Sequence, residues 1–198
     1  MPRAFVALLI SDEARGAVAA EIERLRPLSR AVAWVPPPNL HLTLRFLGEQ
    51  GEDALRQVRG ALEEAAATTG PFTLGLHGLG AFPGFERPRI LWIGVAQGAL
   101  EVRELQANVE RALERAGFAR EPRPWHPHLT IGRVFDERRW RRETSLELRQ
   151  AVARAGSLPF ASVPVAALSL MRSDLSPAGA RYSELASVTL GSVSDSGH

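Results

Sequence analysis

The chain contains no cysteine and no lysine, and each absence excludes a class of chemistry. Without cysteine there is no disulfide framework, no thiolate zinc site and no cysteine nucleophile. Without lysine, all 24 basic residues are arginines, and with a single tyrosine almost nothing titrates between histidine and arginine. The sequence pI of 10.2 therefore reflects a flat titration curve around a net charge of +2, and it does not require a large positive field.

Long apolar runs are also missing. The N-terminal segment holds an apolar run of only seven residues before Ser11 and Asp12, which is too short for a signal-peptide core followed by a cleavage site. No other stretch approaches the length of a transmembrane helix, so we expect a cytoplasmic protein without a membrane partner. At 198 residues and 45% hydrophobic, the chain can bury a core as one domain or as two tightly joined halves.

What the chain does contain is one tetrapeptide pattern written twice, as HLTL at 41–44 and as HLTI at 128–131. Side chains alternate between the two faces of a strand, so the His and Thr of each motif share one face and the aliphatic pair enters the core. A single His-Thr pair on a strand is usually only a half-buried polar pair. Two such pairs with the same aliphatic partners, among five histidines, favour a shared chemical task.

Two imidazoles that oppose each other across a cleft suit in-line displacement at phosphorus. With a pKa near 6.5, one ring can be neutral and take a proton from water while the other is protonated and gives a proton to the leaving oxygen. The hydroxyls of Thr43 and Thr130 can donate to the non-bridging phosphoryl oxygens as charge develops there. No metal or cofactor is needed for this chemistry. The two motifs are nearly equivalent, so the sequence alone does not order the two histidine roles.

Zinc is the competing use of paired histidines, and the sequence disfavours it. A third protein ligand would be needed, but there is no cysteine, and no Asp or Glu lies within four residues of His128. Glu49 is eight residues past His41, which is not the spacing of a helical zinc motif. Glycine-rich phosphate loops, nucleophile elbows and dinucleotide fingerprints are absent as well.

Hydrophobic periodicity predicts an α+β chain whose two halves run in a similar order, each with one motif strand. The expected strands cover 4–10, 39–47, 71–80, 90–95, the second motif, 162–172 and 181–190; the expected helices cover 11–25, a segment opening at 51–53, 99–116 and 137–154. No flexible linker divides the halves. We therefore expect one bilobal domain over 1–190, built as an internal duplication with facing copies, and a disordered tail over 191–198.

Longer segments around the motifs resemble a known family. WVPPPNLHLTLRFLGE, GLGAFPGFERPRILWIGV, RPWHPHLTIGR and LSPAGARYSEL are similar in order and spacing to the RNA 2′,3′-cyclic phosphodiesterase branch (LigT/ThpR family, once described as 2′-5′ RNA ligases) of the 2H phosphoesterase superfamily. The resemblance covers about 3–190. It implies a LigT-like fold with two antiparallel sheets lining a central cleft, helices outside and a pseudo-two-fold axis. It also implies hydrolysis of an RNA 2′,3′-cyclic phosphate to a 2′-phosphomonoester.

The same resemblance assigns roles to individual residues. His41 is expected to be the proton donor and His128 the proton acceptor, with Phe46 and Arg133, five residues beyond each histidine, in contact with substrate. Strict alternation puts Phe46 and Arg133 on the face opposite the histidines, so this assignment needs a bulge or a bend at the strand end. Arg45 is predicted to share the face of His41, either near the phosphate or in a salt bridge at the rim.

Smaller expectations concern neighbouring residues. We expect Gly132 to leave space beside the phosphate and His126 to lie at the rim of the site. We expect His77 and His198 to be incidental. The segment 120–142 holds seven arginines against three acidic residues, a local charge of +4, and it is either a solvated charged face or a surface for RNA phosphates.

RNA ends such as those of tRNA halves, or nucleotides, are the expected partners of a monomeric enzyme without a cofactor. Two alternatives stay open. Another small cyclic phosphate or reversible 2′-5′ RNA ligation would use the same paired histidines. The other alternative is a nucleotide- or RNA-binding module that keeps the fold but has lost catalysis. All four motif residues are intact, which counts against this alternative.

Overall fold

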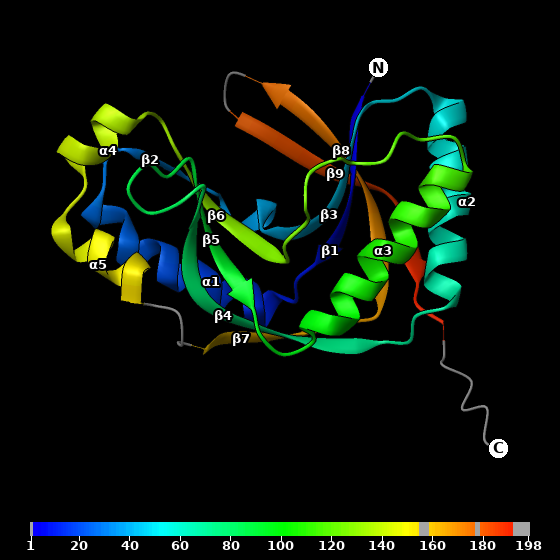
Figure 1. The fold of residues 1–198 in the computed structure, drawn as a ribbon, viewed down its shortest axis with the longest axis horizontal. Coiled ribbons are helices and arrows are strands. Elements are labelled where there is room, and N and C mark those ends of the chain that lie inside the picture. Colours follow the sequence, from blue (N-terminus) through cyan, green and yellow to red (C-terminus); the bar gives the residue numbers. More distant parts are fainter. Residues whose placement is uncertain (1, 155–158, 177–178, 192–198) are drawn as a thin grey trace.

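The computed structural model describes residues 2–154, 159–176 and 179–191. It is an α+β structure of two antiparallel sheets with helices packed on the outside (Figure 1). The predicted fold class is therefore confirmed. The tail predicted to be disordered lies, apart from Gly191, outside the described residues.

Strands from both ends of the chain form the first sheet, which has the order β3-β1-β8-β9. They are β1 (Arg3–Leu9), β3 (His41–Glu49), β8 (Ala167–Ser176) and β9 (Gly179–Thr189). The second sheet has the order β2-β6-β5-β4-β7, built from β2 (Val32–Trp34), β4 (Phe72–Phe82), β5 (Ile90–Val95), β6 (His128–Val134) and β7 (Pro159–Val165). Each sheet thus contains one motif strand, β3 in the first and β6 in the second.

Helices cover one face of each sheet. They are α1 (Asp12–Leu25), α2 (Glu52–Ala67), α3 (Ala99–Arg115), α4 (Glu137–Glu143) and α5 (Leu146–Arg154), with short 3-10 turns at Arg26–Leu28 and Pro37–Asn39. Helices α2 and α3 contact strands of the four-stranded sheet, and α1 and α5 contact strands of the five-stranded sheet (Figure 1). Ser11 caps α1 by accepting a hydrogen bond from the Ala14 N–H, as its position before an acidic first turn predicts.

The region predicted as one helix over 137–154 is two helices. Thr144 leaves helical geometry (φ −115°, ψ 127°) and forms a bridge with Ser29. Both side chains are buried, and their hydroxyls lie 2.7 Å apart. A buried hydroxyl needs a hydrogen-bond partner, so this pair stabilises the break between α4 and α5.

The strand predicted over 162–172 is also wrong as a single element. Residues 159–165 pair with β4 in one sheet, and residues 167–176 pair with β1 and β9 in the other, so the chain changes sheets at Ala166. Strand β2 lies in a segment with no predicted strand, and it pairs with β6 through only three residues. The other predicted elements are confirmed within a few residues of their expected ends.

Candidate active site

Both motifs begin their strands, with His41 opening β3 and His128 opening β6. The aliphatic residues of both motifs are at most 1% exposed: Leu42, Leu44, Leu129 and Ile131. The two histidines and two threonines are half-buried on the opposite face of each strand. We call these faces the motif faces of the two sheets. The alternation predicted from the sequence is therefore confirmed for all eight motif residues.

The two imidazoles are held in the same way. Nδ1 of His41 lies 2.8 Å from the carbonyl oxygen of Asn39, and Nδ1 of His128 lies 2.7 Å from that of His126. A carbonyl oxygen only accepts hydrogen bonds, so Nδ1 carries the hydrogen in both rings. In the neutral form each Nε2 then carries a lone pair and can accept a proton, as a general base requires; at His41 this lone pair accepts a hydrogen bond from the Thr43 hydroxyl 3.0 Å away.

Aromatic rings surround each imidazole. The centroids of Phe5 and Tyr182 lie 4.8 and 5.2 Å from that of His41. On the other sheet, Phe82 lies 5.1 Å from His128, and the Trp92 ring lies 6.4 Å away. These rings restrict water around the imidazoles, and they come from strands remote in sequence from either motif.

Burial lowers the pKa of both histidines below the ordinary value, because a protonated imidazole loses hydration inside the protein. The carbonyl oxygen at each Nδ1 partly opposes this shift by stabilising the protonated ring. The positive charge of Arg133 lowers both pKa values further, and His126 adds to the lowering at His128.

Three observations indicate that the two motifs lie close to each other in the folded chain. Strands β3 and β6 contact each other although they belong to different sheets. The indole N–H of Trp125, just before the second motif, donates to the carbonyl oxygen of Thr43 at 3.1 Å. Arg133 on β6 also acts electrostatically on His41 of the other sheet. The predicted convergence of the motifs therefore has direct structural support.

Bulges decide which residues beyond the motifs share their faces. In β3, the register against β1 shifts after Thr43, so that Phe46 lies opposite Phe5, which contacts His41. The Phe5 and Phe46 rings are 6.1 Å apart, and Phe46 is 59% exposed. In β6, a shift after Thr130 likewise brings the exposed Arg133 onto the face of His128. The required bulges are thus present in both strands.

The same shift in β3 removes Arg45 from the motif face. Arg45 pairs across the sheet with the buried Val6, and its side chain is only 10% exposed. Its guanidinium lies 3.4 Å from Glu110 and 3.6 Å from Glu121, and it donates to the carbonyl oxygen of Ala119. The placement of Arg45 beside His41 was therefore wrong, and the salt-bridge alternative is confirmed.

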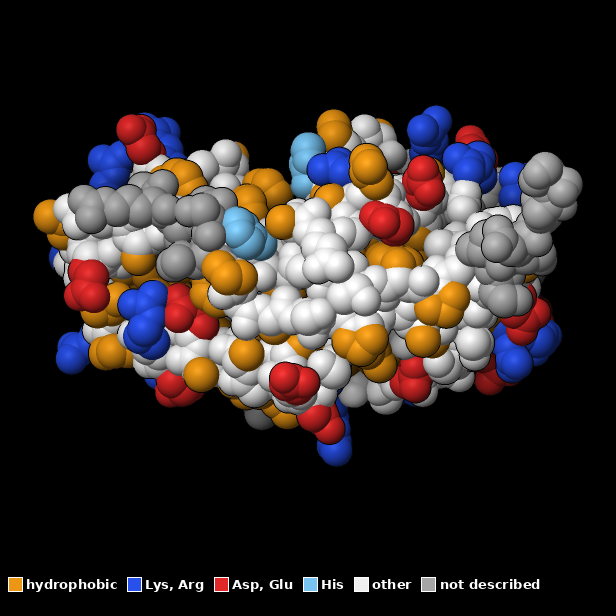
Figure 2. Space-filling view, turned by 90° about the horizontal axis from the view of Figure 1, so that it is seen from below, with side chains coloured by type: hydrophobic (Ala, Val, Ile, Leu, Met, Phe, Trp, Pro, Cys, Tyr) orange, Lys and Arg blue, Asp and Glu red, His pale blue; other side chains and the backbone are white. Residues whose placement is uncertain are grey.

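Ion pairs neutralise much of the arginine-rich segment 120–142. Four of its seven arginines lie within 4 Å of a carboxylate: Arg123, Arg139, Arg141 and Arg142. Figure 2 shows arginine and acidic side chains interleaved on the face it presents. Arg133 has no carboxylate within 4 Å among the described residues. This pattern favours a solvated charged face for most of the segment. Of the three arginines without such a pair in the part of the chain that the structure describes, Arg120, Arg133 and Arg138, Arg133 is the one that shares a strand face with His128.

Gly132 serves packing and does not open space beside a phosphate. A Cβ atom at this position would lie 2.6 Å from Cγ1 of Val32 and 3.3 Å from the Trp34 ring, both on β2. Only glycine permits this close approach of β2 to β6. The expectation for Gly132 was therefore wrong. His126 is exposed beside the second motif as expected, His77 lies on β4, and His198 lies outside the described residues.

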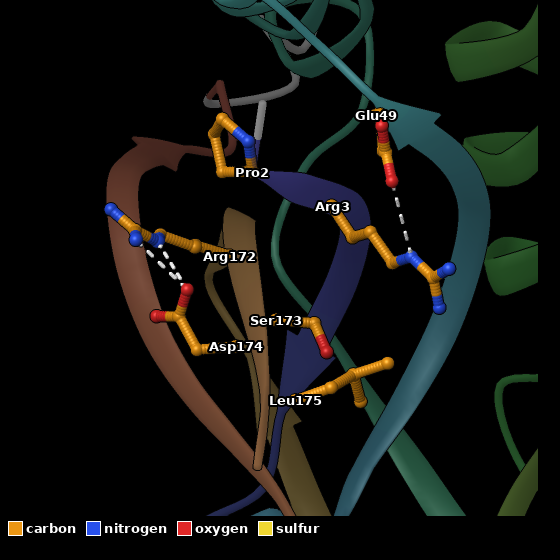
Figure 3. A pocket seen from close by; sticks show the side chains of 7 residues that line it. All are labelled: Pro2, Arg3, Glu49, Arg172, Ser173, Asp174 and Leu175. Atoms are coloured by element: carbon orange, nitrogen blue, oxygen red, sulfur yellow. Dashed lines mark hydrogen bonds and ion pairs between the residues drawn. The ribbon is translucent and has the colours of Figure 1, made fainter.

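One cavity lies away from the histidines. It measures about 470 Å³ and occupies the end of the four-stranded sheet (Figure 3). Two ion pairs line it, Arg3–Glu49 at 3.8 Å and Arg172–Asp174 at 2.8 Å. Neither motif contributes to its lining, so the candidate active site is defined by the paired imidazoles and not by this cavity.

Among the described residues there is no cluster of three or more His, Asp or Glu side chains suited to a metal ion. The described helices also include none that is both long enough and apolar enough to cross a bilayer.

Sequence analysis missed the aromatic neighbours and the Trp125 hydrogen bond. Phe5, Phe82, Trp92 and Tyr182 contact the imidazoles from other strands, so no local pattern identifies them. The alternation of side chains along a strand gives one indication, for Phe5 and Trp92. Each lies between two residues buried in the core, so its own ring must point to the opposite face of the sheet.

Comparison with known proteins gives consistent matches. Residues 14–177 match the family model of the 2′-5′ RNA ligase superfamily. An Archaeoglobus fulgidus protein named RNA 2′,3′-cyclic phosphodiesterase is 36% identical over 183 residues, which cover 92% of this chain and 97% of the relative. A Methanothermobacter thermautotrophicus protein of the same name is 32% identical over 183 residues, covering 92% and 96%.

Solved structures agree with the sequence matches. A Thermus thermophilus protein aligns with a TM-score of 0.73 at 31% identity, covering 96% of this chain and 99% of that protein. Escherichia coli LigT in complex with NADP+ aligns with a TM-score of 0.72 at 25% identity, covering 96% and 98%.

Proposed function

This chain belongs to the 2′-5′ RNA ligase superfamily, and from that membership we propose that it is an RNA 2′,3′-cyclic phosphodiesterase. Relatives bearing that name align with nearly its whole length. In the proposed reaction, water attacks the phosphorus of the terminal cyclic phosphate, the bond to O3′ breaks, and the phosphate stays on O2′. The observation that carries the proposal is the matched pair of imidazoles, each fixed at Nδ1 by a carbonyl and lacking a carboxylate partner among the described residues.

We assign the base to His128 and the acid to His41. The resemblance to the family implies this order, and the charged surroundings are compatible with it, because Arg133 and His126 both lower the pKa of His128, whereas of these two only Arg133 lowers the pKa of His41. A neutral ring is what a base needs. Nε2 of His128 takes the proton of the attacking water, and Nε2 of His41 gives a proton to O3′. Solvent exchange then restores both rings, so the net reaction consumes one water.

The hydroxyl groups stabilise the charge that develops on the phosphoryl oxygens. Thr43 Oγ1 lies 3.0 Å from Nε2 of His41 and accepts from that nitrogen when the ring is protonated. The Thr43 hydrogen is then free to donate to a non-bridging oxygen, and Thr130, which shares the motif face of β6 with His128, can donate to the phosphate as well. A well-placed donor of this kind is typically worth ~10²–10³ in rate.

Phe46 and Arg133 are the proposed substrate contacts. Phe46 is an exposed ring on the motif face of one sheet, which suits stacking of the terminal base. Arg133 is an exposed guanidinium without a carboxylate partner among the described residues, on the motif face of the other sheet, which suits the phosphate.

The direct test is to incubate the protein with an oligonucleotide that ends in a 2′,3′-cyclic phosphate and to determine which hydroxyl keeps the phosphate. A 2′-phosphomonoester is expected. A 3′-phosphate would contradict the assignment of O3′ as the leaving oxygen, and an unchanged substrate would favour a binding module.

Metal independence is a separate part of the proposal. Activity should survive exhaustive chelation, because both proton transfers and the stabilisation of charge are assigned to side chains of this chain. Loss of activity in EDTA with recovery on addition of zinc or manganese would contradict it.

A further inference from the structure

Trp92 lies on the motif face of the five-stranded sheet. Its neighbours Leu91 and Ile93 are 1% and 0% exposed in the core, whereas Trp92 is half-buried on the other side of β5. Across the sheet, Trp92 lies opposite Thr130 of the second motif on one side and opposite Gly80 of β4 on the other. The indole therefore shares its face with the second motif.

Two glycines support the indole from below. A Cβ atom at Gly80 would lie 2.1 Å from Cζ2 of the Trp92 ring and 2.5 Å from its Cε2. One at Gly94 would lie 3.2 Å from Cζ3. The ring thus covers the backbone at both positions, and glycine at position 80 is required for it to do so. An indole that rests on the sheet through one face turns its other face away from the sheet.

The indole adjoins the catalytic imidazole. Trp92 and His128 have centroids 6.4 Å apart, and Phe82 lies 5.1 Å from each of them. Neither Trp92 nor Phe82 belongs to the main hydrophobic core of the described residues. These rings therefore form an aromatic surface that continues from the reaction centre.

We propose that the outer face of the Trp92 indole is a second nucleobase-binding subsite, which stacks the base of the nucleotide preceding the cyclic phosphate in the RNA chain. The inference rests on the proposed function. With Phe46 holding the terminal base on the other sheet, each sheet supplies one aromatic side chain beside the phosphate. Proteins that bind single-stranded RNA commonly hold splayed bases by stacking them on aromatic side chains.

The subsite would make an oligonucleotide end a better substrate than a cyclic mononucleotide. Stacking on an aromatic side chain is worth about 5- to 150-fold in affinity per base, and it tolerates every base because each has a π-face. The enzyme would therefore require at least two nucleotides for full affinity while showing little sequence preference at the second one.

The test compares a 2′,3′-cyclic mononucleotide, a dinucleotide with the same cyclic end, and that dinucleotide without its first base. The measured quantity is the KM of the mononucleotide divided by that of the dinucleotide. This ratio should fall about 5- to 150-fold in Trp92→Leu and much less in Trp92→Phe. If Trp92→Leu also disturbs His128 and slows the turnover of both substrates equally, that effect cancels in the ratio of the two KM values. The abasic dinucleotide should behave like the mononucleotide with the wild-type protein, which tests the subsite even if Trp92→Leu does not fold.

Phe135→Leu is the matched control, because Phe135 is an exposed ring that stacks under Arg139 beyond the end of β6. It should leave the ratio unchanged. An unchanged ratio in Trp92→Leu would overturn the subsite. A second outcome would also overturn it. If Trp92→Leu changed the kinetics only when a separate dinucleotide with a 5′-hydroxyl end was added to the reaction, the base stacked on Trp92 would belong to a second RNA strand and not to the strand that carries the cyclic phosphate.

Failure of the proposed function is distinguishable from failure of the subsite. If the wild-type protein turns over none of the three substrates, the hydrolase assignment fails. Equilibrium binding of the corresponding 2′-phosphorylated mononucleotide and dinucleotide then tests the subsite without turnover. Equal affinities for the two in the wild-type protein would overturn it.

Discussion

His41 and His128 are alike at Nδ1, where each donates to the carbonyl oxygen two residues earlier, and they differ at Nε2 and in their charged neighbours. Nε2 of His41 lies 3.0 Å from the Thr43 hydroxyl. His128 has no corresponding hydrogen bond to Thr130 among the contacts of the described residues, and His126 is an additional neighbour that lowers its pKa. The two copies of the motif thus have different environments.

The difference gives a physical basis for ordering two roles that the motifs alone leave equivalent. Positive neighbours lower the pKa of an imidazole by destabilising its protonated form. Arg133 and His126 both act in this direction on His128, in addition to the burial that lowers the pKa of both rings, which is compatible with His128 as the base. Hydrogen bonding of Nε2 to Thr43 keeps the His41 ring oriented in both protonation states. A cyclic phosphate bound between the rings adds negative charge, which raises both pKa values and lets His41 hold the proton it must give.

The largest expected effect comes from removing either histidine. His41→Ala and His128→Ala should each lower kcat/KM by ~10²–10⁴, because each removes one proton transfer. Both proteins should stay folded, since neither side chain belongs to the main core. His77→Ala is the matched control, because His77 is a half-buried histidine on β4, in the same sheet as His128 but not adjacent to β6, and it should keep wild-type activity. Near-full activity in either motif variant would disprove the paired mechanism.

Two arginines that lie on opposite sides of their strands should separate activity from stability. Arg133→Gln should lower kcat/KM by ~10²–10³ with little change in stability, because Arg133 faces the site. Arg45→Gln should lower the free energy of unfolding by about 1–3 kcal/mol, because Glu110 and Glu121 lose their partner, and it should leave kcat almost unchanged. Steady-state kinetics and urea denaturation on both variants measure the contrast, and the reverse pattern would refute the bulge argument.

The pH dependence of kcat/KM should be bell-shaped and centred below pH 6.5, since it reports the free enzyme, in which both histidine pKa values are lowered. The two limbs belong to the coupled pair. In Arg133→Gln the whole profile should move to higher pH, because the charge that lowers both pKa values is gone. A profile centred above pH 6.5, or one unmoved in this variant, would contradict the electrostatics of the site.

The smallest expected effect is on stability in mild acid. Both histidine pKa values are lower in the folded than in the unfolded protein, so the unfolded chain binds protons first as the pH falls below about 6.5. The free energy of unfolding should therefore decrease through that window. Urea denaturation at pH 7.5 and pH 5.0 should show a smaller decrease in the double variant His41→Ala/His128→Ala. An equal decrease would mean that the two rings do not contribute.

The strands and their faces were predictable because the motifs combine strict alternation with aliphatic partners. The bulges were not, since nothing in the order of residues 41–49 marks the place where β3 gains a residue against β1. That single shift decides that Phe46 faces the site and that Arg45 does not. The resemblance to a family predicted that Phe46 contacts substrate, and the structure has Phe46 on the motif face, whereas alternation alone would have exchanged the two residues.

Contacts between strands that are distant in the sequence were equally unpredictable from the sequence. Phe5 and Tyr182 meet His41 only after both ends of the chain join one sheet. The break between α4 and α5 depends on a hydroxyl pair formed between Ser29 and Thr144, 115 residues apart. Local propensity carries no information on either contact, because each one forms only in the folded structure.

The central claim is that the two imidazoles have different roles, and a substrate with sulfur in place of O3′ tests it most directly. A thiolate leaves without needing a proton, so the sulfur substrate bypasses the acid and still requires the base. The account predicts that His41→Ala recovers most of its lost rate on this substrate and that His128→Ala does not. Recovery of His128→Ala with no recovery of His41→Ala would contradict the assignment.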